Sequence, residues 1–159
     1  MSTDRRIVAF LQNQWFDRPE VVQRCYDGHA GDVYRCCRLT EAYLFMGCLT
    51  GRRLQAAFGG IRDQIAWANA SPKIGDRSSA AFEPDPQHMA KIVQFFKPEI
   101  VIGFGKLAQD GVLQMLPLIK DGLGFHVCSA PHPAARHETV TSELAAVAAD
   151  VRARLRGVA

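Results

Sequence analysis

One histidine of this chain stands between two prolines, where it can act on a ligand. Pro131-His132-Pro133 comes shortly after the apolar run 125–128. Proline fixes its own φ and restricts the residue before it, so the backbone on both sides of His132 has little freedom. A histidine held in this way can donate a hydrogen bond to an oxygen that gains negative charge during a reaction. A structural histidine in a tight turn is the alternative, and these residues alone support both interpretations equally.

Polar and aromatic side chains follow the other apolar runs of the chain. An asparagine offers one acceptor and two donors, so it can pair with both an N–H and a carbonyl of a flat ligand. Aromatic rings can stack on such a ligand, and a Gly-Lys turn at a helix start can hold a phosphate. Together these residues describe a nucleobase pocket beside a phosphate track. They are Gln12, Asn13, Trp15, Asn69, Gly105 and Lys106.

The pattern of the chain predicts the elements that must position these residues. Short apolar runs predict strands at 7–11, 65–69, 99–103 and 124–128. Helices are predicted from Pro19, at 50–58, 86–96 and 107–116, and at 143–155 with Thr141 or Ser142 as the cap, while 26–40 reads as irregular. Strands that alternate with helices are typical of a parallel sheet covered on both faces, and sites form beyond the carboxyl ends of its strands. We therefore predict an α/β fold, a three-layer α/β/α sandwich with a central parallel four-stranded sheet, in one domain over residues 1–159.

Composition narrows the class of protein. The 159 residues suffice for one core, and 48% hydrophobic with 22% charged residues is typical of a globular protein. No apolar run approaches the ~20 residues of a membrane span, and MSTDRR lacks a signal-peptide cleavage pattern, so we expect a cytoplasmic protein. The five cysteines form no CxxC pair, which argues against a disulfide framework and against a zinc site. The net charge of +3 permits a polyanionic partner without requiring one.

The motifs, taken in order, resemble those of the uracil-DNA glycosylase superfamily. LQNQWF at 11–16 stands where that family has GQDPYH or GINPG, and Asn69 in IAWANASP stands where the second strand ends in an asparagine. FGKLAQ at 104–109 is similar to a W-G-S-x-A-Q turn, and HPAAR at 132–136 is similar to HPSPLS. Each motif is weak alone, but four in order across most of the chain make a fairly specific signal.

The resemblance implies a role for each matching residue. Gln12 would bind a uracil oxygen through its backbone, Asn13 would position the attacking water, and Trp15 would pack against C5 and exclude thymine. Asn69 would read the pyrimidine edge, and His132 would stabilise the uracil anion as the glycosidic bond breaks. The remaining roles fall on Phe45 as the aromatic that stacks on the base, Arg136 and His137 as loop residues that enter the duplex, and Gly105, Lys106, Lys73 and Arg77 as contacts to DNA. For Lys73 and Arg77 a solvated loop is an equal alternative.

Departures from the family motifs bear on the expected rate. Leu11 replaces a glycine, Gln14 a proline, Ala134 a serine and Asn13 an aspartate. An amide orients water but does not take its proton, so we expect a working but slower enzyme. The cysteine spacing does not match the iron–sulfur branches of the family, so we expect no cluster, and no metal or organic cofactor is required.

The resemblance thus implies a base-excision repair hydrolase. It would flip uracil out of single- or double-stranded DNA, hydrolyse the N-glycosidic bond and leave an abasic site, as a monomer without lyase activity. Three alternatives stay open at this point. The chain could bind uracil- or abasic-containing DNA without catalysis, act on other bases such as xanthine, hypoxanthine or a mismatched pyrimidine, or be a small-molecule enzyme unrelated to DNA.

Overall fold

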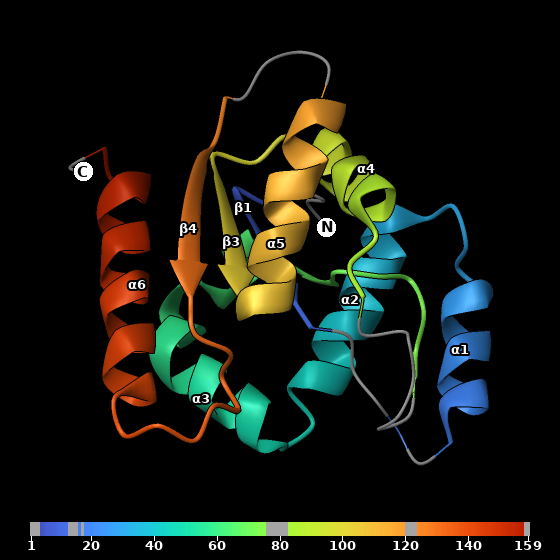
Figure 1. Cartoon of the computed structure of the whole chain (residues 1–159), viewed down its shortest axis with the longest axis horizontal. Helices are drawn as coiled ribbons and strands as arrows, with labels where there is room; N and C mark the ends of the chain where they lie inside the picture. The colour runs from blue at the N-terminus through green and yellow to red at the C-terminus, as the bar shows by residue number, and fades with distance from the viewer. Residues whose placement is uncertain (1–3, 13–15, 17, 76–82, 120–123, 158–159) are drawn as a thin grey trace.

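A parallel sheet forms the centre of the molecule. The computed structural model describes residues 4–12, 16, 18–75, 83–119 and 124–157. Within these ranges the strands are β1 (Ile7–Leu11), β2 (Ile65–Asn69), β3 (Ile100–Phe104) and β4 (His126–Ala130). They pair in parallel in the order β2-β1-β3-β4. Figure 1 labels three of them, β1, β3 and β4. The predicted four-stranded parallel sheet is confirmed.

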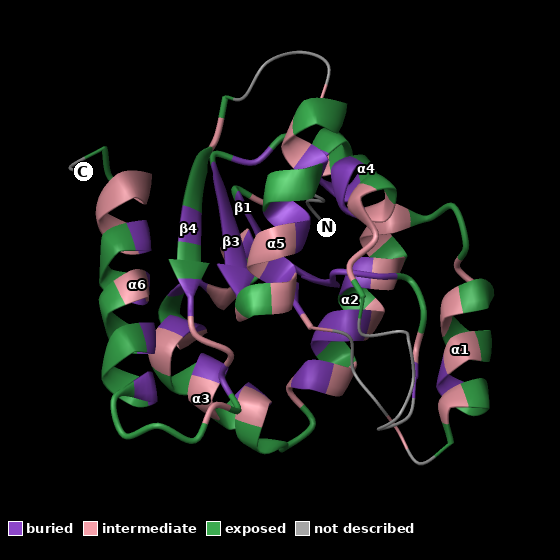
Figure 2. Cartoon of the chain, in the orientation of Figure 1, coloured by how far each residue is buried: buried purple, intermediate pink, exposed green. Residues whose placement is uncertain are grey.

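The strands differ in how far they are buried. Every residue of β1, β2 and β3 is buried, as expected for apolar strands covered on both faces. The last strand, β4, lies at one edge of the sheet and buries only Cys128 and Ala130, so most of it is exposed (Figure 2). One side of β4 therefore faces the core, and the other is accessible to solvent.

Helices cover both faces of the sheet. One face packs against α3 (Leu49–Phe58) and α6 (Val140–Leu155). The other face packs against α4 (Pro86–Phe96) and α5 (Lys106–Met115), and α2 (Val33–Leu44) lies beside β2. These layers confirm the predicted α/β/α arrangement. The first helix, α1 (Pro19–Asp27), lies at the margin of the molecule in Figure 1. Two short 3-10 helices in the described ranges are η1 (Gly59–Gln64) and η3 (Leu116–Leu118).

The ends of α4 follow from local chemistry. Asp85 caps the helix, because its side chain accepts a hydrogen bond from the His88 backbone N–H at 3.1 Å, and Pro86 occupies the first turn. The helix ends at Lys97, which has a left-handed φ of 49° directly before Pro98. The predicted range of this helix is confirmed at both ends.

Two local predictions are wrong. Residues 26–40 are not irregular throughout, since α2 begins at Val33, where the Asp32 side chain accepts from the Arg35 N–H at 3.0 Å. Its buried residues recur at helical spacing and include Cys37 and Leu44. The last helix begins at Val140, so Thr141 and Ser142 lie inside its first turn and do not cap it.

None of the helices in the described ranges is both long enough and apolar enough to cross a membrane.

Candidate functional site

The carboxyl ends of the four strands lie along one edge of the sheet. The register pairs Leu11 with Asn69 and Phe104 with Ala130, so the segments that follow these residues leave the sheet side by side. In strand order, this edge carries four of the predicted site residues, which are Asn69, Gln12, Gly105 and His132. Asn13, Trp15 and Arg77 lie outside the described residues.

Neighbouring backbone groups fix the orientation of the His132 ring. Nδ1 of the ring accepts a hydrogen bond from the Ala134 N–H at 3.1 Å, and the His132 carbonyl accepts from the Ala135 N–H at 2.9 Å. The ring also lies against Gly105, because a Cβ added there would be 3.0 Å from the His132 Cβ and 3.5 Å from Cδ2. The loop and the neighbouring turn thus hold the half-buried imidazole from two sides.

These contacts select one protonation state of His132. A ring nitrogen that accepts an N–H carries no proton, so the neutral imidazole holds its proton on Nε2. Burial lowers the pKa of His132 below its ordinary value of 6.5. At neutral pH the ring is therefore uncharged and offers an Nε2–H donor.

Arg53 orders the loop that carries His132. From α3 its Nη1 donates to the carbonyl oxygens of Pro133 at 2.7 Å and Ala135 at 2.8 Å. The sequence pattern predicts that Arg52 and Arg53 both lie on an exposed helix face. Arg52 is exposed as predicted, but Arg53 is half-buried. No sequence signal distinguishes the two, since the contact joins segments 80 residues apart.

The turn at Gly105 brings the start of α5 to the same edge. Gly105 has a φ of 84°, and its N–H donates to the Ala130 carbonyl at 2.8 Å. The Gln109 side chain donates to that same oxygen at 2.9 Å. The N-cap residue of α5, Gly105, has no side chain that could cap the helix, so the first backbone N–H groups of α5 can meet a ligand beside His132, and Lys106 is exposed.

Asn69 is buried at the end of β2, and in the described part of the chain its Oδ1 has no hydrogen-bond partner. Alternation along the strand puts its side chain on the face of Trp67. The backbone around it is fixed, because the Ala70 N–H donates to Leu11 at 2.9 Å and the Asp85 N–H donates to Ala70 at 2.8 Å. A buried, unpartnered acceptor in a fixed frame is a position where a ligand can complete the hydrogen bonding.

His88 supports Asn69 from α4. Its ring donates to the Asn69 backbone carbonyl, and burial lowers the pKa of His88 below 6.5. The sequence gives this histidine no motif context. Its position three residues after the Asp85 cap is the signal that places it in the first turn of α4.

Phe45 does not share a cavity with Asn69. The guanidinium of Arg62 lies 3.7 Å from the centroid of the Phe45 ring, and the Trp67 ring lies 5.2 Å away in an edge contact. Arg62 is held in turn by Glu41 at 3.1 Å. One face of the Phe45 ring is therefore covered, and a base could stack only on the other face.

A cavity of about 580 Å³ lies beside β2, between α1, α2 and α4. Asn69 and the exposed Lys73 border it, together with His88. Among the described residues, Phe45, Gly105 and His132 do not line it. The predicted site residues therefore do not share one cavity: Asn69 and Lys73 border this one, Gly105 and His132 lie at the other end of the edge, and Phe45 lies apart from both.

The loop after His132 is accessible to a large partner. Arg136 and His137 are exposed there, as a contact to DNA would need. His137 is already engaged, since its Nε2 lies 2.6 Å from Oε2 of Glu143 at the start of α6.

A scan against protein-family models and a search of curated proteins found no match for this chain.

Proposed function

We propose that this protein hydrolyses the N-glycosidic bond of uracil in DNA and leaves an abasic site. The observation that carries the proposal is the state of His132, a neutral imidazole whose Nδ1 is bound by Ala134 and whose Nε2–H is available. When the bond breaks, the base departs as an anion with charge on its carbonyl oxygens. A preorganised donor in a partly desolvated site stabilises such an oxygen without having to reorganise.

Asn69 supports a pyrimidine as the leaving base. Its unpartnered Oδ1 can accept from N3–H of uracil, while its amide nitrogen donates to the adjacent carbonyl. β2 and β4 are three strand spacings apart, about 14 Å between the backbones of the two strands. A base that lies across the middle strands is reached from one side by Asn69 and from the other by His132.

The remaining steps fall on residues with simpler tasks. Asn13 orients the attacking water, which an amide can do without taking its proton. Lys106, Arg136 and the N-terminus of α5 bind phosphates, so affinity for DNA falls steeply with salt. The target nucleotide leaves the base stack before cleavage. We propose that the protein acts in the cytoplasm as a monomer, without a metal or organic cofactor in the reaction.

Strand cleavage tests the proposal. A labelled oligonucleotide with one uracil, single- or double-stranded, is incubated with enzyme in excess and treated with alkali. We expect cleavage by the wild type, and a fall of at least ~100-fold in His132→Ala, because the main stabilising donor is lost. Asn69→Ala should also lower the rate. The control is His29→Ala, which should leave the rate unchanged, because His29 is far in sequence from the residues at the sheet edge.

Other outcomes identify the alternatives. Absence of cleavage on both substrates would contradict the proposal. A gel shift specific for uracil or abasic DNA would then indicate a binding protein without catalysis, and release of xanthine or hypoxanthine would indicate an enzyme for other damaged bases. A protein that neither binds nor cleaves DNA would be an α/β enzyme for a small molecule.

A further inference from the structure

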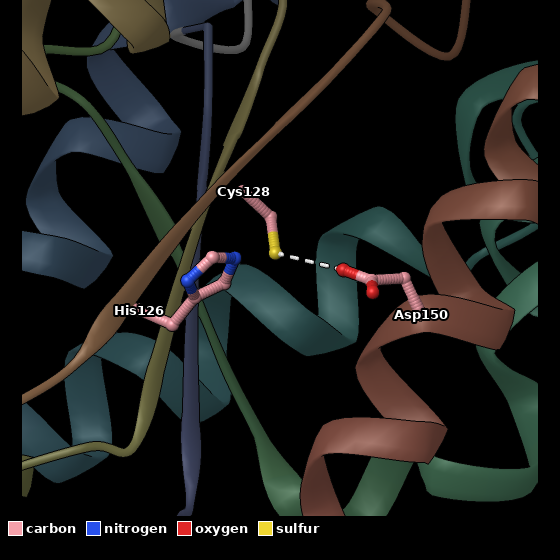
Figure 3. Close-up of side chains that lie close together, drawn as sticks. All are labelled: His126, Cys128 and Asp150. Carbon is pink, nitrogen blue, oxygen red and sulfur yellow. Dashed lines mark hydrogen bonds between the residues drawn. The ribbon is translucent and has the colours of Figure 1, made fainter. Parts of the chain in front are cut away.

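Three potential metal ligands meet between β4 and α6. His126 and Cys128 stand two residues apart on β4, and Asp150 faces them from α6 (Figure 3). One ligand atom from each residue lies within 4.8 Å of the other two. His126 is the first residue of β4 and pairs with Ile100, the first residue of β3. The cluster therefore lies away from the carboxyl ends of the strands, where His132 follows β4.

The separations fit a tetrahedral ion after small adjustments. Zn²⁺ binds sulfur at about 2.3 Å and nitrogen or oxygen at about 2.0–2.2 Å, so neighbouring ligand atoms around it lie roughly 3.3–3.7 Å apart. The Cys128 Sγ and Asp150 Oδ2 are already 3.8 Å apart. His126 and Asp150 are exposed, so rotation of their side chains can supply the remaining movement while both backbones stay in place.

We infer that His126, Cys128 and Asp150 form a Zn²⁺ site, with water at the fourth position. A thiolate, an imidazole and a carboxylate together suit Zn²⁺, whereas Mg²⁺ and Ca²⁺ take oxygen ligands alone. The cysteine spacing does not indicate this site. Two of its ligands are two residues apart on a strand, and the third comes from a helix more than twenty residues later. The site is separate from the proposed glycosylase reaction and does not depend on it.

Without metal, the cluster is a thiol paired with a carboxylate. The Cys128 S–H donates to Asp150 Oδ2, and burial together with Asp150 raises the pKa of Cys128 to about 11. Metal binding would therefore release one proton from the thiol. Arg154 also donates to Oδ2, at 3.0 Å, but a carboxylate has further acceptor positions for a metal. The positive charge of Arg154 opposes a dication, so Arg154→Gln should bind Zn²⁺ more tightly.

The site would join the edge strand to the helix that covers it. β4 has a neighbouring strand on only one side, and α6 packs on the same face of the sheet as Cys128. An ion held by both elements binds the folded state in preference to the unfolded chain, so it raises the midpoint of thermal unfolding.

Cobalt spectroscopy tests the inference on the full chain under reducing conditions. Exposed Cys25 and Cys48 are first changed to serine, so that accessible thiols elsewhere do not compete. Serine can still cap α3 in place of Cys48, whose side chain accepts from the Gly51 N–H. Titration with Co²⁺ should give a thiolate-to-metal charge-transfer band that saturates at one equivalent and is removed by Zn²⁺.

Variants then identify the ligands. Cys128→Ser should abolish the band, and His126→Asn and Asp150→Asn should each weaken binding at least about tenfold, while His29→Asn leaves it unchanged. Zn²⁺ should raise the thermal midpoint of the wild type and not that of Cys128→Ser. A band that persists in Cys128→Ser, or affinity that His126→Asn and Asp150→Asn leave intact, would overturn the site. Absence of both a band and a thermal shift in the wild type would do the same.

Discussion

The side chain of Arg53 and the backbone of Pro133 are in contact across 80 residues of chain, with 2.7 Å between Nη1 and the Pro133 carbonyl oxygen. The same nitrogen lies 2.8 Å from the carbonyl oxygen of Ala135. These two carbonyls lie on the C-terminal side of His132, where the loop turns back. Helix α3 therefore fixes the loop that presents the imidazole through two backbone carbonyls, Pro133 and Ala135, that flank the ring on its C-terminal side.

Arg53→Ala should lower the rate of uracil excision with little change in affinity for DNA. The substitution frees the Pro133 and Ala135 carbonyls, and a displacement of a catalytic group by about 1 Å can cost ~100-fold in rate. Single-turnover kinetics separates the rate from binding. Arg52→Ala is the matched control, because the neighbouring arginine is exposed. An equal effect of the two substitutions would show that Arg53 acts through charge and not through the loop.

Gly105→Ala should displace His132. A Cβ at Gly105 would lie 3.0 Å from the His132 Cβ, and the φ of 84° is unfavourable for any residue with a side chain. We expect a loss of roughly 1–3 kcal/mol in the free energy of unfolding and a lower excision rate. Urea unfolding and the oligonucleotide assay measure the two effects.

Gly31→Ala is the control for Gly105→Ala. Gly31 has a similar φ of 86°, but a Cβ there meets no atom within 4 Å. This variant should therefore lose stability through its backbone while excision is retained. If Gly31→Ala lost as much activity as Gly105→Ala, reduced stability and not the contact with His132 would explain the loss.

Glu41→Gln should destabilise the fold more than Glu99→Gln. Glu41 is 9% exposed and accepts from Arg38 at 2.9 Å and from Arg62 at 3.1 Å. Loss of a buried charge between two arginines should cost about 1–3 kcal/mol in the free energy of unfolding. Glu99 pairs with Arg6 on the surface, where a pair contributes about 0–1 kcal/mol. If urea unfolding showed the same loss of stability for Glu41→Gln and Glu99→Gln, burial of Glu41 would not explain its contribution.

The sheet is predictable from the sequence because its strands are continuous apolar runs. β1, β2 and β3 are buried on both faces, so the apolar residues of each strand are enough to predict it. Helix α2 is harder to detect, because glycines precede it and two of its buried residues, Thr40 and Glu41, are polar. The local signals that do indicate this helix are its capping residue, Asp32, and the helical spacing of its buried positions.

The site is only partly predictable, for a different reason. Asn69 and His132 follow strands, and parallel strands bring such residues to one edge whatever the details of packing. The roles of Arg53, His88 and Arg62 depend on where whole helices dock against that edge. No spacing in the chain encodes those contacts, so the support around each predicted residue required the structure.

Stability should fall as the pH drops through the ordinary range of histidine. Burial lowers the pKa values of His88 and His132 below 6.5, so the unfolded chain takes up these two protons at a higher pH than the folded protein does. Their contribution to the free energy of unfolding is complete above pH 6.5 and is lost progressively as the pH falls from there toward the folded pKa values. Urea unfolding between about pH 7.5 and pH 5 avoids most carboxylate titration.

Excision should respond to pH differently from stability, because of the two half-buried histidines only His132 is proposed to act on the departing base. Protonation places an N–H on Nδ1, which would then face the Ala134 N–H and break that 3.1 Å hydrogen bond. The neutral ring, and with it the excision rate, should therefore persist below pH 6.5 before declining. His88→Gln should flatten the stability profile in part and leave the acid limb of excision where it is. An acid limb centred above pH 6.5, or one that moves in His88→Gln, would contradict a neutral His132 as the donor to the departing base.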